Sequence, residues 1–226
     1  MSRRESAHAT RVAAWSVASA LLRYPDESLA AALPAIREAA LAEKIPHAGD
    51  VAALIDAWRE RELVVLETEY VEIFDLGRST SLYLTWHQYG DRRQRGLVLS
   101  KLKREYMSHG MSPLESELPD WLPLMLEFAA NVPDPIGVNL LEKWRAAIEL
   151  IRKVLHDQDR PQAVLLDVVS ATLPKLGGNV REMVERLLAE GPPDEEVGLE
   201  PFGPGNEMPG AFANTELSAL TGGPNE

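Results

Sequence analysis

Apolar residues recur three and four positions apart along most of the chain, which is the spacing of one face of an α-helix. The first such stripe lies between residues 12 and 22. Asp26 has a side chain suited to an N-cap, so we expect a second helix from there to about Ala42. A third helix is expected from about Asp50 to Phe74, with Gly77 marking its end.

Further helices are expected in the second half of the chain. Leu82–Trp86 should form a short helical piece, and Asp91 should cap a helix that runs to about His109. Asp120 should cap the next helix, because Pro123 then falls in the first turn, where no intrahelical N–H bond is lost. A further helix is expected from Leu141 to Leu155, where apolar residues form a seam along one face. Two shorter helices are expected near Gln162–Leu173 and Lys175–Glu190.

No segment alternates between apolar and polar residues with the period of a strand, and the Val and Leu runs lack the turn signals of a hairpin. We therefore predict an all-α fold, a single helical bundle domain over residues 1–190. From Gly191 onward the composition changes: thirteen of the last 36 residues are Gly or Pro, and seven are acidic with no Lys or Arg. Such a segment buries too little apolar surface to offset its ordering entropy, so residues 191–226 are predicted to be a disordered acidic tail.

The charge and the residue usage exclude several classes of protein. The net charge of −12 disfavours a nucleic-acid partner, since phosphate binding needs a basic face. The absence of cysteine excludes disulfides, a thiol nucleophile and cysteine-ligated metals. Arg3-Arg4 and the apolar residues near Ala13 outwardly resemble a signal peptide, but Glu5 follows the arginines and no cleavage pattern appears. With no apolar run of about 18 residues, we expect a cytoplasmic protein without membrane insertion.

Catalytic signatures are missing from the chain. The five histidines do not pair at zinc-ligand spacings, and there is no phosphate-binding loop, dinucleotide fingerprint or nucleophile elbow. We therefore predict a binding protein that is not an enzyme and holds no metal or cofactor. Six cations between Arg92 and Arg104 indicate a solvated helix face, and the alternative is a cationic rim for an acidic peptide or for the protein's own tail. Trp86 is a candidate exposed anchor, whereas the remaining tryptophans are expected in the core: Trp15, Trp58, Trp121 and Trp144.

A set of short motifs lies in one block between Glu69 and Ala130. In chain order they comprise Tyr70, Phe74, Asp75, Gly77, Arg78, Thr80, Ser81, Leu82, Gly90, Arg93, Arg95, Gly96, His109, Gly110, Glu117, Leu118, Pro119, Asp120, Leu122 and Pro123. In this order and spacing, the block resembles the NarJ-type assembly chaperones of respiratory nitrate reductase, within the TorD-like family of molybdoenzyme chaperones. Outside the block, the resemblance is mainly one of helical layout, with Leu21–Asp26 as a further short motif.

This resemblance implies a fold of the TorD-like type and a specific function. Proteins of this kind bind the apo catalytic (alpha) subunit of respiratory nitrate reductase at its N-terminal segment. They support molybdenum cofactor insertion and membrane assembly without joining the finished enzyme. The resemblance also admits contacts with proteins of molybdenum cofactor biosynthesis. Two alternatives stay open: a chaperone of the same fold for another molybdoenzyme, such as an N- or S-oxide reductase, and an enzyme such as a nucleotide hydrolase, against which the missing phosphate loop counts.

The resemblance also implies a peptide-binding cleft between helices. The residues expected to line it are Tyr70, Phe74, Tyr83, Leu122 and Leu126, of which Tyr83 and Leu126 lie outside the shared motifs. Three carboxylates are expected to hold the surrounding loops in place or to meet a basic or amide-rich end of the peptide: Asp75, Glu117 and Asp120.

Overall fold

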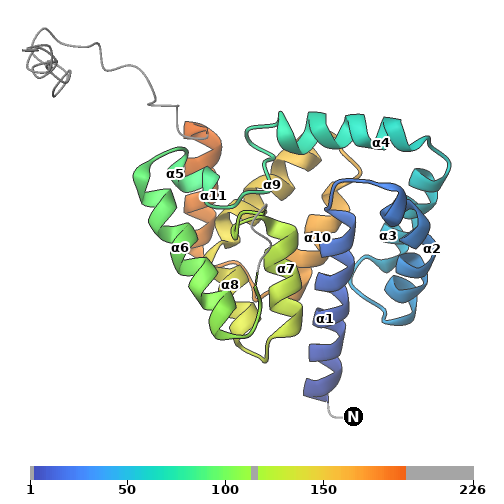
Figure 1. Ribbon diagram of the computed structural model, residues 1–226, viewed down its shortest axis with the longest axis horizontal. Coiled ribbons are helices and arrows are strands. Elements are labelled where there is room, and N and C mark those ends of the chain that lie inside the picture. The colour runs from blue at the N-terminus through green and yellow to red at the C-terminus, as the bar shows by residue number, and fades with distance from the viewer. Residues whose placement is uncertain (1–2, 113–116, 192–226) are drawn as a thin grey trace, which may run out of the picture. The chain divides into compact units, whose positions relative to one another are not determined.

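The computed structural model describes residues 3–112 and 117–191, and it is helical throughout these ranges apart from turns and one isolated β-bridge. This confirms the predicted all-α fold. The described residues belong to one compact unit, while residues 192–226, which hold nearly all of the predicted tail, lie outside them. The helices in Figure 1 are α1 (Arg3–Leu21), α2 (Glu27–Ala42), α3 (Ala48–Arg59), α4 (Leu63–Tyr70), α5 (Trp86–Tyr89), α6 (Arg93–Ser108), α7 (Leu122–Asn131), α8 (Ile136–Lys143), α9 (Arg145–Asp157), α10 (Ala163–Thr172) and α11 (Gly178–Glu190).

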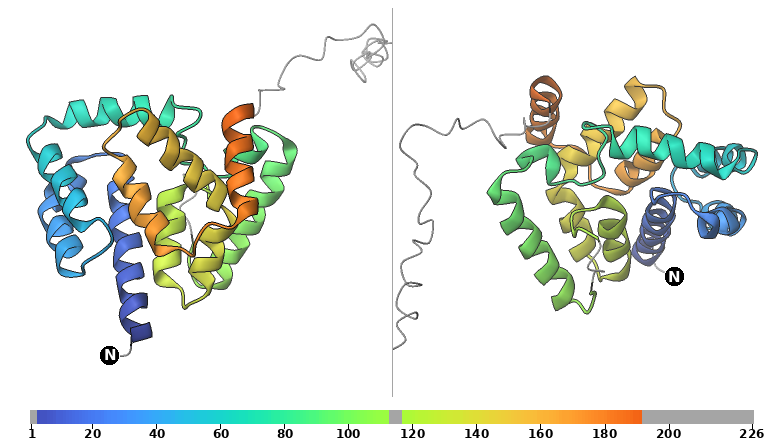
Figure 2. Two further views of the ribbon diagram at one scale, coloured as in Figure 1. Left: turned by 180° about the vertical axis from the view of Figure 1, so that it is seen from behind. Right: turned by 45° about the horizontal axis from the view of Figure 1, so that its top comes forward.

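Helix α1 lies at the centre of the packing. It contacts α7 and α10 on one side and α2 on the other, and α3 lies beside α2 on that outer flank (Figure 2). The indole of Trp15 on α1 is completely buried and donates a hydrogen bond to Thr172 Oγ1 at 2.8 Å. Trp58 and Trp144 are buried as predicted, but Trp121 is only half-buried. Its partial exposure gives Trp121 a place in the site described below.

The predicted helix from Asp50 to Phe74 is wrong, because the chain turns after Arg59 and starts α4 at Leu63. At the turn, the Arg61 N–H donates to the Trp58 carbonyl at 3.1 Å and the Val65 N–H donates to the Glu62 carbonyl at 3.0 Å. Helix α4 then passes into a π-helical turn, Val71–Asp75, before Gly77. This turn carries Phe74 into the core.

Three other predicted boundaries are also wrong. Helix α6 begins at Arg93 after Arg92, which takes the N-cap position without a side-chain cap, so Asp91 does not cap it. The predicted seam helix is divided at the buried residue Trp144, between α8 and α9. The residues before Trp86 are not helical, because their backbone pairs with a distant segment. Within the described ranges, no helix joins the length and the apolar character that crossing a bilayer requires.

Candidate peptide-binding site

Two segments far apart in the sequence are joined by backbone hydrogen bonds. The Leu84 N–H donates to the Asp120 carbonyl at 3.0 Å, and the Leu122 N–H donates to the Leu82 carbonyl at 2.8 Å. Between these bonds, Tyr83 and Trp121 form an antiparallel β-bridge. The pairing places the chain after the π-helical turn against the start of α7, so their side chains line a common wall.

A tight turn at Gly77 connects the π-helical turn to the paired segment around Tyr83. A Cβ at Gly77 would overlap Thr80 Oγ1 and the Ile73 carbonyl, so the position has room only for glycine. The Thr80 hydroxyl donates to the Ile73 carbonyl, and the Thr80 N–H donates to the Gly77 carbonyl at 3.0 Å. Thr80 therefore holds this turn closed.

A cleft of about 160 Å³ opens beside this turn. Five of the eight predicted site residues line it: Tyr70, Phe74, Asp75, Tyr83 and Glu117. The other three lining residues are Tyr24, Leu82 and Trp121. The aromatic rings pack in sequence, with centroids 5.4 Å apart from Tyr24 to Tyr70 and 5.1 Å apart from Tyr70 to Phe74. We name this space the aromatic cleft.

The three remaining predicted residues are completely buried behind the aromatic cleft. Leu122 and Leu126 belong to the hydrophobic core, so neither presents surface to a ligand. The prediction that Asp120 caps α7 is wrong, because Trp121 takes that position without a side-chain cap. Asp120 Oδ2 instead accepts hydrogen bonds from the Thr85 N–H at 3.2 Å, from the Thr85 hydroxyl, and from Arg95 Nη2 at 3.4 Å. Asp120 thus ties the two paired segments together.

Tyr24 and Trp121 line the aromatic cleft, although neither was among the predicted site residues. Tyr24 lies in the short Leu21–Asp26 motif, which was a usable signal. Trp121 adjoins the Glu117–Asp120 motif, but a tryptophan beside a predicted helix is more often a core residue. Trp86, the predicted exposed anchor, is half-buried and lies outside the aromatic cleft, with the Arg78 guanidinium 5.8 Å from its ring centroid.

The aromatic cleft combines apolar rings with polar groups of defined protonation. Burial raises the pKa of Tyr70, and the Asp75 charge raises it further, so its phenol stays protonated at neutral pH. Burial and the Glu117 charge likewise raise the pKa of Tyr83. The pKa of Asp75 is raised by burial. Neither Asp75 nor Glu117 forms an ion pair with a described residue. The aromatic cleft can therefore take apolar side chains together with a cationic or amide-bearing group.

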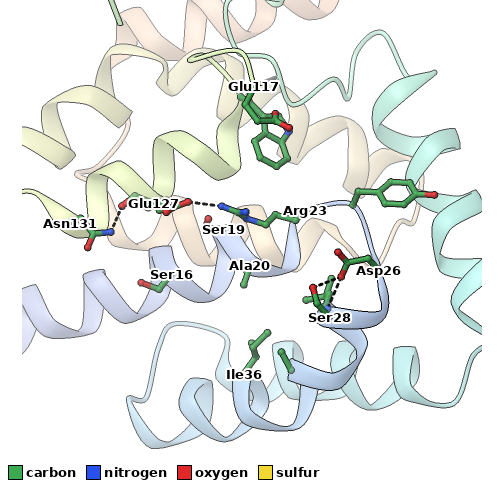
Figure 3. Close-up of a pocket in the computed structure, with 14 residues that line it drawn as sticks. Ser16, Ser19, Ala20, Arg23, Asp26, Ser28, Ile36, Glu117, Glu127 and Asn131 are labelled. Atoms are coloured by element: carbon green, nitrogen blue, oxygen red, sulfur yellow. Dashed lines mark hydrogen bonds and ion pairs between the residues drawn. The ribbon is translucent and has the colours of Figure 1, made fainter. Parts of the chain in front are cut away.

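A larger cavity of about 610 Å³ lies next to the aromatic cleft, between α1, α2 and α7 (Figure 3). Tyr24, Glu117 and Trp121 line both spaces, so the two are contiguous. We name the second space the α1–α2–α7 cavity. Arg23 extends from the end of α1 towards Glu127 on α7 and pairs with it at 2.5 Å, as Figure 3 shows.

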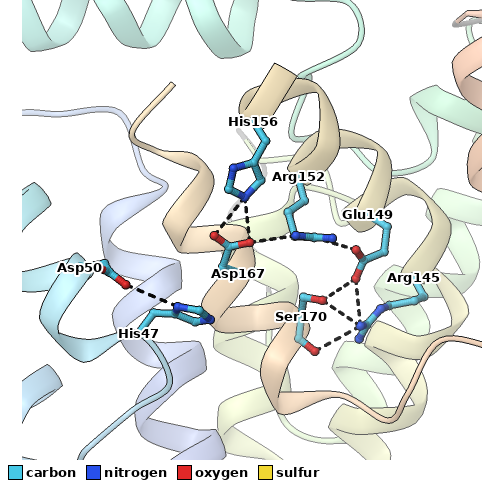
Figure 4. A network of polar contacts seen from close by, with 8 residues as sticks. All are labelled: His47, Asp50, Arg145, Glu149, Arg152, His156, Asp167 and Ser170. Atoms are coloured by element: carbon cyan, nitrogen blue, oxygen red, sulfur yellow. Dashed lines mark hydrogen bonds and ion pairs between the residues drawn. The ribbon is translucent and has the colours of Figure 1, made fainter. Parts of the chain in front are cut away.

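A separate polar cluster joins α9 to α10 away from the aromatic cleft (Figure 4). The buried Glu149 carboxylate pairs with the Arg145 guanidinium at 2.9 Å, and it accepts hydrogen bonds from Arg152 at 2.7 Å and from the Ser170 hydroxyl at 2.6 Å. Arg152 also pairs with Asp167 at 3.0 Å. Every oxygen of Glu149 has a partner, so this cluster has a structural role. Within the described ranges, no group of three His, Asp or Glu side chains is arranged to hold a metal ion.

The described residues thus form an all-helical protein with an aromatic cleft at its surface. Comparison with protein families matches residues 24–163 to the nitrate reductase delta subunit family. The chain belongs to this family, as its sequence motifs predicted. The matched range contains every residue that lines the aromatic cleft.

Curated relatives carry related names. The chain is 36% identical over 178 residues to the probable nitrate reductase molybdenum cofactor assembly chaperone NarJ of Bacillus subtilis, covering 76% of this chain and 92% of that protein. It is 34% identical over 156 residues to NarJ of Escherichia coli K12, covering 68% and 66% of the two chains. It is 31% identical over 169 residues to the nitrate reductase-like protein NarX of Mycobacterium tuberculosis H37Rv, covering 72% of this chain but 24% of NarX. The two NarJ proteins are named as assembly chaperones and not as catalytic enzymes.

Proposed function

We propose that this protein is a chaperone that assembles a respiratory nitrate reductase. It binds the N-terminal segment of the apo catalytic (alpha) subunit in the cytoplasm. It keeps that subunit competent for molybdenum cofactor insertion and membrane assembly, and it leaves before the enzyme is complete. The observation that carries this proposal is the aromatic cleft, which lies inside the family-matching range and is lined by the half-buried Tyr70 and Tyr83 together with two carboxylates.

The chemistry of the aromatic cleft supports a peptide as the ligand. Its volume of about 160 Å³ suits one or two side chains of a peptide rather than a folded partner or a bulky cofactor. Burying an apolar side chain against rings such as those of Tyr70 and Phe74 stabilises a complex by about 1.5–3 kcal/mol. The protonated phenol of Tyr83 can donate a hydrogen bond to a peptide carbonyl, and Asp75 or Glu117 can accept one from a peptide N–H.

This arrangement also supports a transient complex. Two or three anchors in a small cleft give moderate affinity, because ordering a flexible segment opposes the gain from burial. A chaperone that leaves the finished enzyme needs such an affinity. Binding by helix-in-groove or by capture of an extended strand both fit a cleft with an aromatic wall.

The proposal is tested by co-expressing the apo catalytic subunit with this protein and measuring the molybdenum content of the purified subunit. We expect molybdenum content to fall when this protein is omitted and when Tyr83→Ala replaces the wild type. The control is Leu97→Ala, since Leu97 on α6 is 64% exposed and lies outside the aromatic cleft. Full molybdenum loading without this protein would contradict the proposal.

The client is tested in the same cells by identifying the subunit that co-purifies with this protein. Recovery of the nitrate reductase catalytic subunit, and its loss when the N-terminal segment is deleted, is the expected result. Recovery of an N- or S-oxide reductase instead would assign the same cleft to a different molybdoenzyme. Co-purified proteins of molybdenum cofactor biosynthesis would identify the further partners that the family resemblance implies.

A further inference from the structure

The α1–α2–α7 cavity has a distinct charge balance. Among the described residues that line it, the ionised side chains are the carboxylates of Asp26, Glu117 and Glu127 and the guanidinium of Arg23. The Asp26 carboxylate is occupied as the N-cap of α2, where it accepts from the Leu29 N–H at 2.7 Å. Glu127 pairs with Arg23. Glu117 is left without an ionic partner among the described residues, so the cavity carries an excess of negative charge and repels anionic ligands.

Arg23 indicates which chemistry this wall accepts. Its guanidinium carbon lies 5.6 Å from the centroid of the Trp121 ring while its Nη2 pairs with Glu127. An aromatic face next to a carboxylate is the environment that attracts a guanidinium or an ammonium group. Arg23 and Glu127 are both almost half exposed, so this pair is weak and can exchange for an equivalent one.

The rest of the lining fits the stem of a long cationic side chain. Ala20, Leu29, Ala32 and Ile36 supply an apolar floor between α1 and α2. Lys and Arg bury their methylene stems on such a surface while the charged head remains near water. The volume of about 610 Å³ lies within the range of roughly 300–1,000 Å³ that is common for binding pockets.

We propose that the α1–α2–α7 cavity is a subsite for an Arg or Lys side chain of the client segment, which lies against Trp121 and pairs with Glu117. Arg23 occupies part of this subsite in the free protein and competes with the incoming cation. The subsite is continuous with the aromatic cleft, so one peptide spans both spaces, with apolar side chains in the aromatic cleft and a cationic side chain in the cavity. The identity of the peptide rests on the proposed function, whereas the preference for a cation rests on the cavity itself.

The cation preference is tested without the client. The full-length protein, labelled with ¹⁵N, is titrated with N-acetyl-arginine amide and with N-acetyl-citrulline amide, which has the same shape and no charge. We expect saturable shifts of the Trp121 indole and of the Tyr24 amide with the arginine probe and at least about tenfold weaker binding of the citrulline probe. Equal binding of the two probes, or shifts only at other positions, would overturn the subsite.

Substitutions test whether Glu117 is the carboxylate that pairs with the arginine probe. Glu117→Gln should weaken the arginine probe about fivefold, the effect of one partly exposed charge pair. Glu185→Gln makes the same change at an exposed position on α11 and should have no effect. Arg23→Gln should tighten binding, because it removes the competing guanidinium. An unchanged affinity in Glu117→Gln, or a weaker one in Arg23→Gln, would contradict the assignment. Helical circular dichroism of each variant checks that the fold is kept.

The link to the client is tested with a synthetic peptide of the N-terminal segment of the catalytic subunit. Replacing its basic residues by citrulline one at a time should lower affinity for the wild type at one position, and that loss should be absent in Glu117→Gln. If the peptide binds equally well after every basic residue is replaced, the α1–α2–α7 cavity does not bind a cationic side chain of this client. Failure of this peptide to bind at all, while the arginine probe still binds, would count against the proposed function and leave the cation subsite in place.

Discussion

Replacing Asp120 by Ala removes the side chain that joins the two walls behind the aromatic cleft. Asp120 is completely buried, and its Oδ2 atom accepts from both polar groups of Thr85 and from Arg95. A helix N-cap would contribute only about 0.5–2 kcal/mol. The buried position of Asp120 therefore predicts a larger loss of stability than the loss of a helix cap would cause.

The magnitude follows from these contacts. Hydrogen bonds to a charged group contribute about 1.5–3 kcal/mol each. Arg95 keeps 17% of its side chain exposed and can partly rehydrate, so its share is at the lower end. Three bonds near the lower limit predict that Asp120→Ala lowers the free energy of unfolding by about 4–5 kcal/mol, which for a chain of this size lowers Tm by roughly 8–20 °C. Asp120→Asn keeps an acceptor for Thr85 and should lose about half as much.

The assay is urea unfolding of wild type, Asp120→Ala, Thr85→Val and the double variant, followed by circular dichroism. If Asp120 acts through Thr85, the double variant should be less destabilised than the sum of the two single variants, by about 1–2 kcal/mol. A loss below about 1 kcal/mol for Asp120→Ala, or strict additivity of the two substitutions, would refute the reasoning.

Three further predictions concern other buried groups. Glu149→Ala should lower the free energy of unfolding by about 3–5 kcal/mol, because it leaves Arg145 charged and buried; chemical unfolding measures this, and a loss under about 1 kcal/mol would contradict it. Burial lowers the pKa of His87 to about 4, so the free energy of unfolding should fall as pH drops from about 6.5 towards 4. His87→Gln should flatten that decline in thermal melts at several pH values. The same decline in wild type and variant would contradict this prediction. Phe74 is only 5% exposed, so Phe74→Ala should lower the free energy of unfolding by about 3 kcal/mol or more in unfolding titrations. It should also weaken peptide binding. Unchanged stability and affinity would exclude Phe74 both as a core residue and as a peptide contact.

The helical fold could be predicted because its signals are local. The spacing of Val12, Trp15, Ser19 and Leu22 identifies α1, and Asp26 caps α2 through the Leu29 N–H as its side chain indicated. Pro123 falls in the first turn of α7, also as predicted. Each of these features depends on residues within one or two helical turns of each other.

The missed features depend on contacts between distant residues. Asp120 has the sequence signal of a helix cap, but the pairing of its segment with the one around Leu84 turns its side chain to Thr85, 35 residues away. The same pairing keeps Leu82–Thr85 out of a helix. The candidate site divides in the same way: Tyr70, Phe74 and Asp75 follow from one local motif, whereas only the fold places Tyr24 beside Tyr70.

The central claim is that the aromatic cleft binds the N-terminal segment of the nitrate reductase catalytic subunit. Isothermal titration calorimetry of that peptide with the full-length protein, repeated at several temperatures, tests this most directly. We predict saturable binding with a negative heat-capacity change, because apolar surface is buried. We predict at least tenfold weaker binding to Tyr83→Ala and unchanged binding to Leu97→Ala. No binding of the peptide to the wild type, or equal binding to both variants, would contradict the account.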